Sequence, residues 1–301
     1  MTTDTTPTTG QIRALDELAG PDGLIVGAAA DHRDSLHRTL AARGIELDHD
    51  GVVELKLRIL RALAPCATMV LIDVEHGAER ALAEGVVPGD TGVAIPLEAQ
   101  GYGGLHEIAQ TELLGDVDPA RVRRLGGCAA KLLLPYRIDE ADQAARQDAV
   151  VEGVARACRE AGVALVLEPV AYARPGETRA GAERFGELVV DGARRLAAFG
   201  PTVLKVQHPG SRAACMAMDE ACGSIPWVLL GGGEPPEVLL AQVEDACRAG
   251  ASGAIVGRTL FDEAVTADPA AAERALQEVS LPLLERLSGV VQEYGRPWRQ
   301  R

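Results

Sequence analysis

The chain has 301 residues, of which 47% are hydrophobic and 25% are charged, the proportions of an ordinary globular protein. This length allows either two average domains or one large domain with a single core. A formal net charge of -14 argues against nucleic acid or an anionic membrane as a partner, although it does not exclude a small positive pocket.

The chain shows no targeting or membrane signal. Its N-terminus, "MTTDTTPTTG", is polar and lacks a signal-peptide core, and no apolar run is long enough to span a membrane. Six cysteines form no CxxC pair and show no zinc-site spacing. Most of them lie beside alanine in apolar patterns, so we expect small buried residues in a reduced, cytoplasmic protein.

Eight short apolar runs, each bounded by turn residues, have the length of buried parallel strands. In chain order they are 24–30, 68–73, 92–98, 128–134, 163–169, 202–207, 226–232 and 253–258. Helical patterns lie between them. The clearest, "DEADQAARQDAVVEGVARACREAG", has an acidic start and a glycine stop, and "PPEVLLAQVEDACRAG" has proline in its first turn.

Eight strands alternating with helices predict a single α/β domain, a (β/α)8 TIM barrel over residues 12–301, preceded by a disordered tail over residues 1–11. No Pro/Ser-rich linker or long charge run divides the chain. A doubly wound open sheet is the competing fold. That fold more typically has a GxGxxG turn after its first strand, where this chain has "AAADHRDSL".

Polar residues collect at the carboxyl ends of the predicted strands, whereas the strand interiors are almost wholly apolar. In a (β/α)8 barrel the active site lies at this end, in the loops that follow the strands. The concentration of polar residues there therefore predicts an enzyme. The residues are Asp31, Arg33, Asp73, Glu75, Glu98, Lys131, Glu168, Lys205, Gly231, Gly232, Gly233, Gly257 and Arg258.

Lysine is rare in this chain, which has 27 arginines and three lysines. Lys56 lies in the helical pattern "GVVELKLRIL", whose charged positions we expect to face water. Lys131 and Lys205 instead interrupt the apolar runs "CAAKLLLPY" and "PTVLKVQHPG". Arginine stays protonated, whereas burial or a neighbouring cation can neutralise a lysine amine, which can then form a Schiff base with a carbonyl. These two lysines suggest amine chemistry, and the alternative is a structural ion pair.

Eight blocks of the sequence resemble, in order and spacing, those of the class I tagatose-1,6-bisphosphate aldolases and their relatives, the sulfofructosephosphate aldolases. They are "GAAADHRDSLHR", "VLIDVEHG", "GVAIPLEAQGY", "AAKLLLPY", "LVLEPVAY", "VLKVQHP", "LLGGG" and "GAIVGRTLF". The resemblance covers residues 12 to 290, nearly the whole chain. It implies a Schiff-base retro-aldol reaction without metal or cofactor, which cleaves a phosphorylated or sulfonated ketohexose to dihydroxyacetone phosphate and an aldehyde.

The same resemblance implies roles for individual residues. Lys205 matches the Schiff-base lysine, and Glu168 matches the carboxylate that shuttles protons. Lys131 matches a second active-site lysine, and Asp31 a substrate-facing aspartate. Glycine backbone N–H groups and an arginine are also suited to binding phosphate after strands seven and eight. We therefore expect the substrate to be bound by Arg33, Glu98, His208, Gly231, Gly232, Gly233, Gly257 and Arg258.

Departures from the family pattern border the predicted pocket and leave the substrate open. His32 follows Asp31 where the family typically has glutamine, and Gln207 and His208 replace a glutamate and an aliphatic residue. The segment "YARPGETRAGAERFG" is only loosely similar. "VGRTLFDEA" also resembles the last block of aldolases that act on deoxy-keto-gluconate phosphates. A related lysine-dependent aldolase or transaldolase acting on a deoxy-keto sugar phosphate is therefore an alternative.

Histidines at the predicted strand ends raise a different mechanism. His32, His76 and His208, with Asp31 and Asp73, are residue types that hold a divalent metal in barrel hydrolases and class II aldolases. Such sites usually contain a compact HxH or HxxxH element, and this chain has neither, so we expect no metal.

Two expectations remain. The chain could be a sugar-phosphate sensor without activity, but that role would need neither Lys205 nor Glu168. Because the outer helices of barrels commonly support dimers or larger assemblies, we expect a homo-oligomer.

Overall fold

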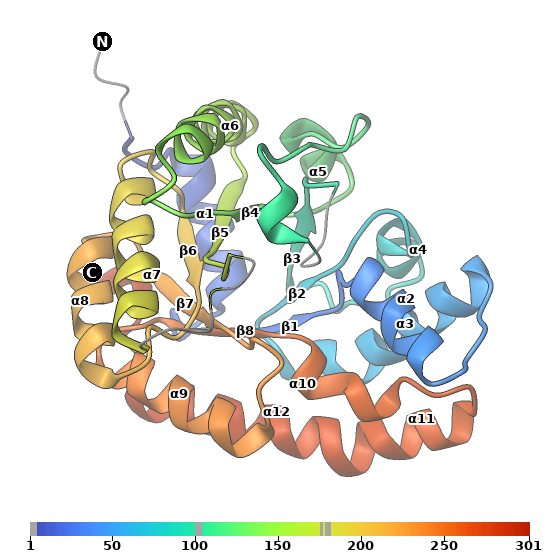
Figure 1. Ribbon diagram of the computed structural model, residues 1–301. Helices are drawn as coiled ribbons and strands as arrows, with labels where there is room; N and C mark the ends of the chain where they lie inside the picture. Colours follow the sequence, from blue (N-terminus) through green and yellow to red (C-terminus); the bar gives the residue numbers. More distant parts are fainter. Residues whose placement is uncertain (1–4, 100–103, 175–176, 178–181) are drawn as a thin grey trace.

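Eight parallel strands pair in sequence order and close into a barrel, because β8 pairs with β1 as well as with β7 (Figure 1). The computed structural model describes residues 5–99, 104–174, 177 and 182–301. Each predicted apolar run overlaps one strand, which confirms the (β/α)8 barrel. The strands are β1 (Ile25–Ala29), β2 (Met69–Leu71), β3 (Gly92–Pro96), β4 (Ala129–Pro135), β5 (Ala164–Val170), β6 (Val203–Val206), β7 (Trp227–Leu230) and β8 (Gly253–Val256).

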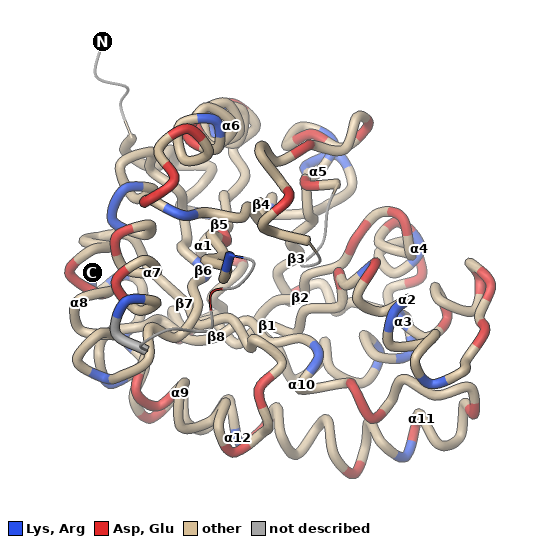
Figure 2. Tube along the Cα trace, viewed as in Figure 1, with Lys and Arg blue, Asp and Glu red and all other residues tan. Residues whose placement is uncertain are grey.

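Helices surround the barrel, and most of the charged residues lie on these helices and on the loops (Figure 2). None of the helices in the described ranges is both long and apolar enough to cross a membrane. The helices are α1 (Thr9–Ala19), α2 (Asp34–Ala42), α3 (His49–Leu63), α4 (Ala78–Ala83), α5 (Pro119–Arg124), α6 (Ala141–Ala161), α7 (Ala182–Ala197), α8 (Arg212–Cys222), α9 (Pro236–Arg248), α10 (Arg258–Phe261), α11 (Pro269–Ala275) and α12 (Leu281–Tyr294).

Alternation along each strand separates two buried faces. Outward residues such as Leu132 and Leu134 of β4 pack with the surrounding helices. Inward residues such as Ala29, Val166 and Val203 form a second apolar cluster inside the barrel. On five strands, or directly after them, a charged residue follows a residue of this inner cluster by two or four positions. Its side chain therefore lies on the same inward face. These side chains are Asp31, Glu98, Lys131, Glu168 and Lys205.

Helix α1 closes the amino end of the barrel. Its apolar residues, Leu15 and Leu18 among them, belong to the inner cluster. Gln11, from the first turn of the helix, is also buried, and its amide nitrogen lies 3.4 Å from the hydroxyl oxygen of Thr202, just before β6. The inner face of the barrel is therefore covered at this end, and the carboxyl ends of the strands are left to form a site.

The predicted tail differs from the structure at its boundary. Residues 9–11 form the first turn of α1, because Thr8 caps the helix by accepting a hydrogen bond from the backbone N–H of Gln11. Residues 1–4 lie outside the described part of the chain. The cysteines are all free thiols, and five of the six are buried, whereas Cys66 is exposed.

Lys56 does not face water, so the expectation for this residue was wrong. Its side chain is 1% exposed and forms an ion pair with Asp73, which follows β2. Burial would raise the pKa of Asp73, but the ammonium of Lys56 and the hydrogen bonds to the carboxylate lower it overall. A buried ammonium requires a partner of opposite charge, and here the partner comes from another element.

The contact between β8 and β1 generates a prediction about stability. Gly253 has φ +143°, and a Cβ at this position would lie 1.8 Å from the carbonyl oxygen of Ile25. Gly253→Ala should therefore reduce the free energy of unfolding by about 3 kcal/mol. As the matched control, Gly153→Ala lies in α6, where a Cβ would meet no atom within 4 Å, and it should increase stability by about 0.5–1 kcal/mol. Urea unfolding measures both, and equal effects would contradict the prediction.

Candidate active site

A cavity of about 590 Å³ lies at the carboxyl ends of the strands. Of the three lysines, Lys205 alone lines it. Phe185 of α7 and Gln242 of α9 extend the wall beyond the strands and their loops. The lining residues are Ala29, His32, Val170, Phe185, Lys205, Gln207, His208, Gly210, Leu230, Gly231, Gly232, Gly233, Glu234, Gln242, Ile255, Gly257 and Arg258.

Five charged side chains are buried against one another at the inner end of this cavity. Lys131 Nζ lies 2.5 Å from Glu98 Oε1 and 3.0 Å from Asp31 Oδ2. The same nitrogen lies 3.3 Å from Glu168 Oε2. Lys205 Nζ lies 3.0 Å from the other oxygen of Glu168, Oε1. Glu168, which is 0% exposed, therefore bridges the two lysines with one oxygen toward each.

Two carboxyl groups in this cluster have pKa values shifted in opposite directions. Burial would raise the pKa of Asp31, but the positive charges around it, Lys131 foremost, hold it well below its ordinary value. Burial raises the pKa of Glu98, the charge of Asp31 adds to the rise, and Lys131 offsets it only in part. Glu98 also accepts a hydrogen bond from the backbone N–H of Leu133 at 3.0 Å. Of the two groups, Glu98 is therefore the first to take up a proton as pH falls.

The loop after β7 lies directly against Arg258. Gly232 and Gly233 have φ values of 59° and 79°, in the left-handed region that favours glycine. A Cβ at Gly233 would lie 3.1 Å from Arg258 Nη2, and this nitrogen donates to the carbonyl oxygen of Gly232 at 3.3 Å. No carboxylate in the described part of the chain forms an ion pair with Arg258, and its Nε is buried without a partner there. The guanidinium charge is thus available to an anion in the cavity.

His208 presents a hydrogen-bond donor to the cavity. Its Nδ1 accepts the backbone N–H of Gly210 at 3.1 Å. Burial lowers the pKa of His208, and the charge of Asp245 opposes this shift only in part, so the ring is neutral at pH 7. In a neutral imidazole whose Nδ1 accepts, Nε2 carries the proton. This Nε2 is buried and has no partner among the described residues, so it can donate to a substrate oxygen.

His32 is packed tightly into the wall between β1 and β8. Burial lowers the pKa of His32 to about 4, although the charge of Asp31 opposes the shift. The imidazole meets the ring of Phe261 edge to face, with centroids 5.5 Å apart. A Cβ at Gly257 would lie 2.2 Å from His32 Cε1. Glycine at position 257 is therefore required by the neighbouring ring.

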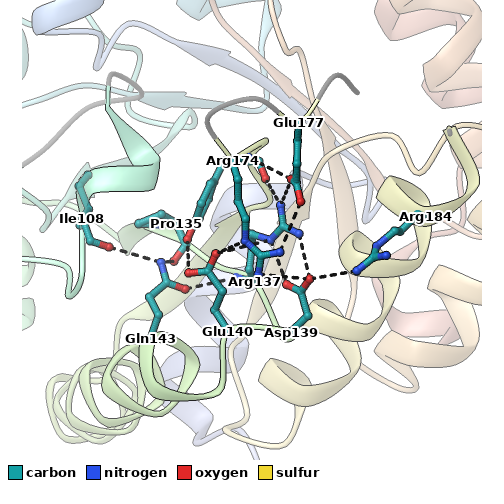
Figure 3. Close-up of polar contacts among 10 residues, drawn as sticks. Ile108, Pro135, Arg137, Asp139, Glu140, Gln143, Arg174, Glu177 and Arg184 are labelled. Atoms are coloured by element: carbon teal, nitrogen blue, oxygen red, sulfur yellow. Dashed lines mark hydrogen bonds and ion pairs between the residues drawn. The ribbon is translucent and has the colours of Figure 1, made fainter. Parts of the chain in front are cut away.

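A network of arginines and carboxylates connects the loops after β4 and β5 (Figure 3). Arg137, which is 2% exposed, donates to Asp139 at 2.9 Å, to Glu177 at 2.7 Å and to the carbonyl oxygen of Tyr172 at 2.8 Å. Arg174 adds ion pairs to Asp139 and Glu177. These contacts fix the first residues of the loop that follows β5, the strand that carries Glu168.

The structure brings the predicted site residues together in two groups. Those that line the cavity are Lys205, His208, Gly231, Gly232, Gly233, Gly257 and Arg258. Those buried behind its wall are Asp31, Arg33, Glu98, Lys131 and Glu168. Arg33 belongs to the second group because it donates to the carbonyl oxygen of Glu98 at 2.7 Å.

The histidines and aspartates considered as metal ligands do not meet in the cavity. In the described ranges, one set of His, Cys, Asp and Glu residues is close enough to hold an ion, and it comprises Asp73, Glu75 and His76. None of these three lines the cavity, whereas His32 and His208 do.

Three residues with polar or aromatic side chains that line the cavity were not predicted from the sequence. They are Phe185 of α7, Gln242 of α9 and Glu234 in the loop after β7. The helical residues carry no local signal, because their position depends on how α7 and α9 pack against the barrel. Glu234 directly follows the glycines of "LLGGG", so this block indicated the loop in which Glu234 lies.

The two lysines should differ in their effect on stability. Lys131→Met removes the cation shared by Asp31, Glu98 and Glu168, and we expect a loss of about 3–5 kcal/mol at pH 8. Lys205→Met leaves Glu168 paired with Lys131, so its loss should be smaller. Urea unfolding of both variants measures the difference.

The loss of unfolding free energy caused by Lys131→Met should also depend on pH. Without the Lys131 ammonium, burial should raise the pKa values of Asp31 and Glu98 in the folded protein above those in the unfolded chain. The folded variant then binds more protons than the unfolded variant does, so the loss of unfolding free energy should become smaller as pH falls from 8 toward 5. A deficit that grows over this range, or equal losses for the two lysine variants, would contradict the arrangement described.

Comparison with known proteins gives relatives that match half or nearly all of the chain. Tagatose 1,6-diphosphate aldolase 2 of Enterococcus faecalis is 29% identical over 168 residues, 56% of this chain and 50% of that protein. A protein of the same name from Streptococcus pyogenes is 24% identical over 331 residues, 98% of this chain and 99% of that protein. The first alignment thus spans about half the length of the relative.

A solved structure supports the fold. An archaeal fructose-1,6-bisphosphate aldolase, with its catalytic Lys covalently bound to the carbinolamine intermediate of the substrate, superposes with a TM-score of 0.62 at 17% identity. The superposition covers 94% of this chain and 99% of that one. A model of the DeoC/LacD family of aldolases matches residues 25–263, from β1 to the segment after β8. Because this match includes the whole barrel, the chain belongs to the DeoC/LacD family of aldolases.

Proposed function

We propose that this protein is a class I aldolase that reversibly cleaves a phosphorylated or sulfonated ketohexose to dihydroxyacetone phosphate and an aldehyde. The observation that carries the proposal is the bridge formed by Glu168 between Lys131 and Lys205. Only Lys205 of this pair lines the cavity. A nucleophilic amine therefore faces the substrate with a proton acceptor 3.0 Å away.

Imine formation requires three proton transfers, and Glu168 is placed for the first and the last of them. Glu168 takes a proton from the ammonium of Lys205, and the amine then attacks the ketone carbon. A proton moves from nitrogen to oxygen to give the carbinolamine. Glu168 returns its proton to the hydroxyl, which leaves as water, and a protonated imine remains. Lys131 stays beside Glu168 throughout and stabilises its ionised form.

Bond cleavage uses the imine as an electron sink. Glu168, ionised again after the dehydration, takes the proton from the hydroxyl group two carbons from the imine carbon, and the carbon–carbon bond breaks to release the aldehyde. The electron pair of that bond remains as an enamine on Lys205. Glu168 then returns this proton to the enamine carbon, and addition of water to the resulting protonated imine gives the ketone product and restores the ammonium of Lys205. His208 Nε2–H, which faces the cavity, donates to a substrate oxygen during these steps.

The anionic end of the substrate is assigned to the loops after β7 and β8. Arg258 supplies a fixed positive charge without a carboxylate partner in the described chain. Gly232 and Gly233 allow an anion to approach the backbone closely, because they carry no side chain. Phosphate and sulfonate both suit this combination of guanidinium and backbone N–H groups.

The names of the relatives support this class of substrate. The matched Enterococcus and Streptococcus proteins are tagatose 1,6-diphosphate aldolases, and the archaeal enzyme holds its substrate as a carbinolamine on a lysine. A deoxy-keto sugar phosphate would use the same lysine, so it is the alternative substrate class. His32, Gln207 and His208 line the cavity and are the positions at which this pocket departs from the family pattern.

We also propose that the protein is cytoplasmic and forms a homo-oligomer. Met216 of α8 and Val238 of α9 are large exposed hydrophobic residues on two consecutive outer helices, which suits a subunit contact. A monomer in analytical ultracentrifugation would exclude the oligomer.

Borohydride trapping tests the proposed reaction. Incubation with a cleavable ketose phosphate and borohydride should reduce the imine, inactivate the protein and add the mass of the reduced adduct to the peptide that contains Lys205. A panel of ketose bisphosphates, sulfosugar phosphates and deoxy-keto sugar phosphates reports the substrate at the same time. Lys205→Arg should abolish the adduct. An adduct on Lys131, or on neither lysine, would overturn the assignment.

The anion site has a separate test. Arg258→Ala removes a charge-assisted contact worth about 1.5–3 kcal/mol, so KM for anionic ketoses should rise about tenfold to a hundredfold. Trapping at Lys205 should persist at high substrate concentration, because the amine is unchanged. Arg286→Ala, an exposed arginine paired with Glu237 on the outer helices, is the control and should leave KM unaltered. Equal KM values for the two variants would place the anion elsewhere.

A further inference from the structure

Three of the chain's six histidines gather at one place outside the cavity. His37 lies on α2, His49 begins α3 and His76 lies in the loop after β2. The ring centroids of His37 and His49 lie 5.5 and 5.6 Å from that of His76. Three separate elements therefore each contribute one imidazole to the same spot. Neither the proposed reaction nor the hydrophobic core accounts for this convergence.

The innermost of these rings is already oriented by a carboxylate. His76 is 3% exposed, and its Nδ1 lies 3.0 Å from Asp73 Oδ1. The same oxygen accepts the backbone N–H of His76 at 2.8 Å, and the other oxygen of Asp73 pairs with Lys56. Because Nδ1 is held in this way, Nε2 is the nitrogen left to bind a ligand. A histidine held by a carboxylate on one nitrogen and facing outward with the other is a common arrangement at metal sites.

A second carboxylate completes the set. Glu75 Oε1 lies 3.8 Å from His76 Nε2, and the Glu75 side chain is 61% exposed. An ion between these two atoms, at about 2.0–2.2 Å from each, fits this separation. Glu75 and His76, with Asp73, already have ligand atoms within 4.8 Å of one another. His37 and His49 lie outside that set, but both are exposed, so their rings would turn toward the ion when it binds. His49 would exchange its present contact with the Glu75 carbonyl oxygen, at 2.9 Å, for the metal.

We propose that His37, His49, Glu75 and His76 form a binding site for a divalent transition metal, with Zn²⁺ as the ion that suits it best. Three imidazoles and one carboxylate supply the four ligands of a tetrahedral zinc site. Mg²⁺ and Ca²⁺ prefer oxygen ligands, so they fit this set poorly. Asp73 acts as the positioning carboxylate rather than as a ligand, since both its oxygens are engaged.

The site is peripheral to the proposed chemistry. None of its four ligands lines the cavity that contains Lys205. A bound ion would link α2, α3 and the loop after β2, and so it would stabilise this side of the barrel by binding only the folded state. Its existence is therefore independent of whether the protein is an aldolase.

The test uses untagged full-length protein that has been dialysed against EDTA and then freed of the chelator. Because Cys66 is an exposed thiol, all proteins carry Cys66→Ser to remove a competing ligand. Titration calorimetry with Zn²⁺ and visible spectroscopy with Co²⁺ report binding and geometry. The variants are the double substitution His37→Ala/His49→Ala and the control His106→Ala, an exposed histidine outside the cluster.

The parent protein and the His106→Ala control should bind one Zn²⁺ per chain, give the intense visible bands of tetrahedral Co²⁺ and gain thermal stability with the ion. The double variant should bind at least about 100-fold more weakly and lose the bands. Both of its substitutions are at exposed positions, so it should still fold, which circular dichroism would verify. Absence of stoichiometric binding by the parent, or equal affinity of the double variant and the control, would overturn the proposal.

Discussion

The buried charges at the carboxyl end of the barrel are the constraint on which the rest of the site depends. Two ammonium groups and three carboxylates are almost wholly buried, and desolvation costs several kcal/mol for each such ion. The cost is offset only because the groups alternate in sign: Lys131 holds three carboxylates, and Glu168 holds both lysines. Removing Lys131 would take the shared ammonium away from all three carboxylates in a medium of low dielectric constant, so the positions of the five groups depend on one another.

This rigidity matters for chemistry as much as for stability. A catalytic group must be held in its productive geometry before the substrate arrives. A carboxylate such as Glu168, with an ion pair on each oxygen, has little freedom to move out of that geometry. The contacts of Arg137 with the loop after β5 extend the same support outward from Glu168. By contrast, Arg258 and His208 each retain a polar atom without a partner in the described chain. The site thus combines an inner part, in which the charged groups are paired with one another, and an outer part, in which Arg258 and His208 can bind a ligand.

The sequence predicted those features that depend on local pattern. The strands were located because apolar runs bounded by turn residues repeat eight times. The charged residues were found because they collect at the carboxyl ends of these otherwise apolar runs, where a barrel has its active site. The rarity of lysine singled out Lys131 and Lys205. Lys56 was misjudged because a helical pattern does not reveal that Leu55 and Leu57 beside it are buried as well, nor that Asp73 supplies a partner. Such pairings depend on tertiary contacts.

Both ends of the described chain lie at the amino end of the barrel, on the side that α1 closes. Thr5 lies against Gly200, which precedes β6, and Arg301 donates to the carbonyl oxygen of Gly250, which precedes β8. The backbone N–H of Trp298 also donates to Gly23, just before β1. The cavity lies at the opposite end of the strands. Immobilising the protein on a solid support, or fusing another domain to it, through either terminus therefore leaves the path from solvent to Lys205 unobstructed.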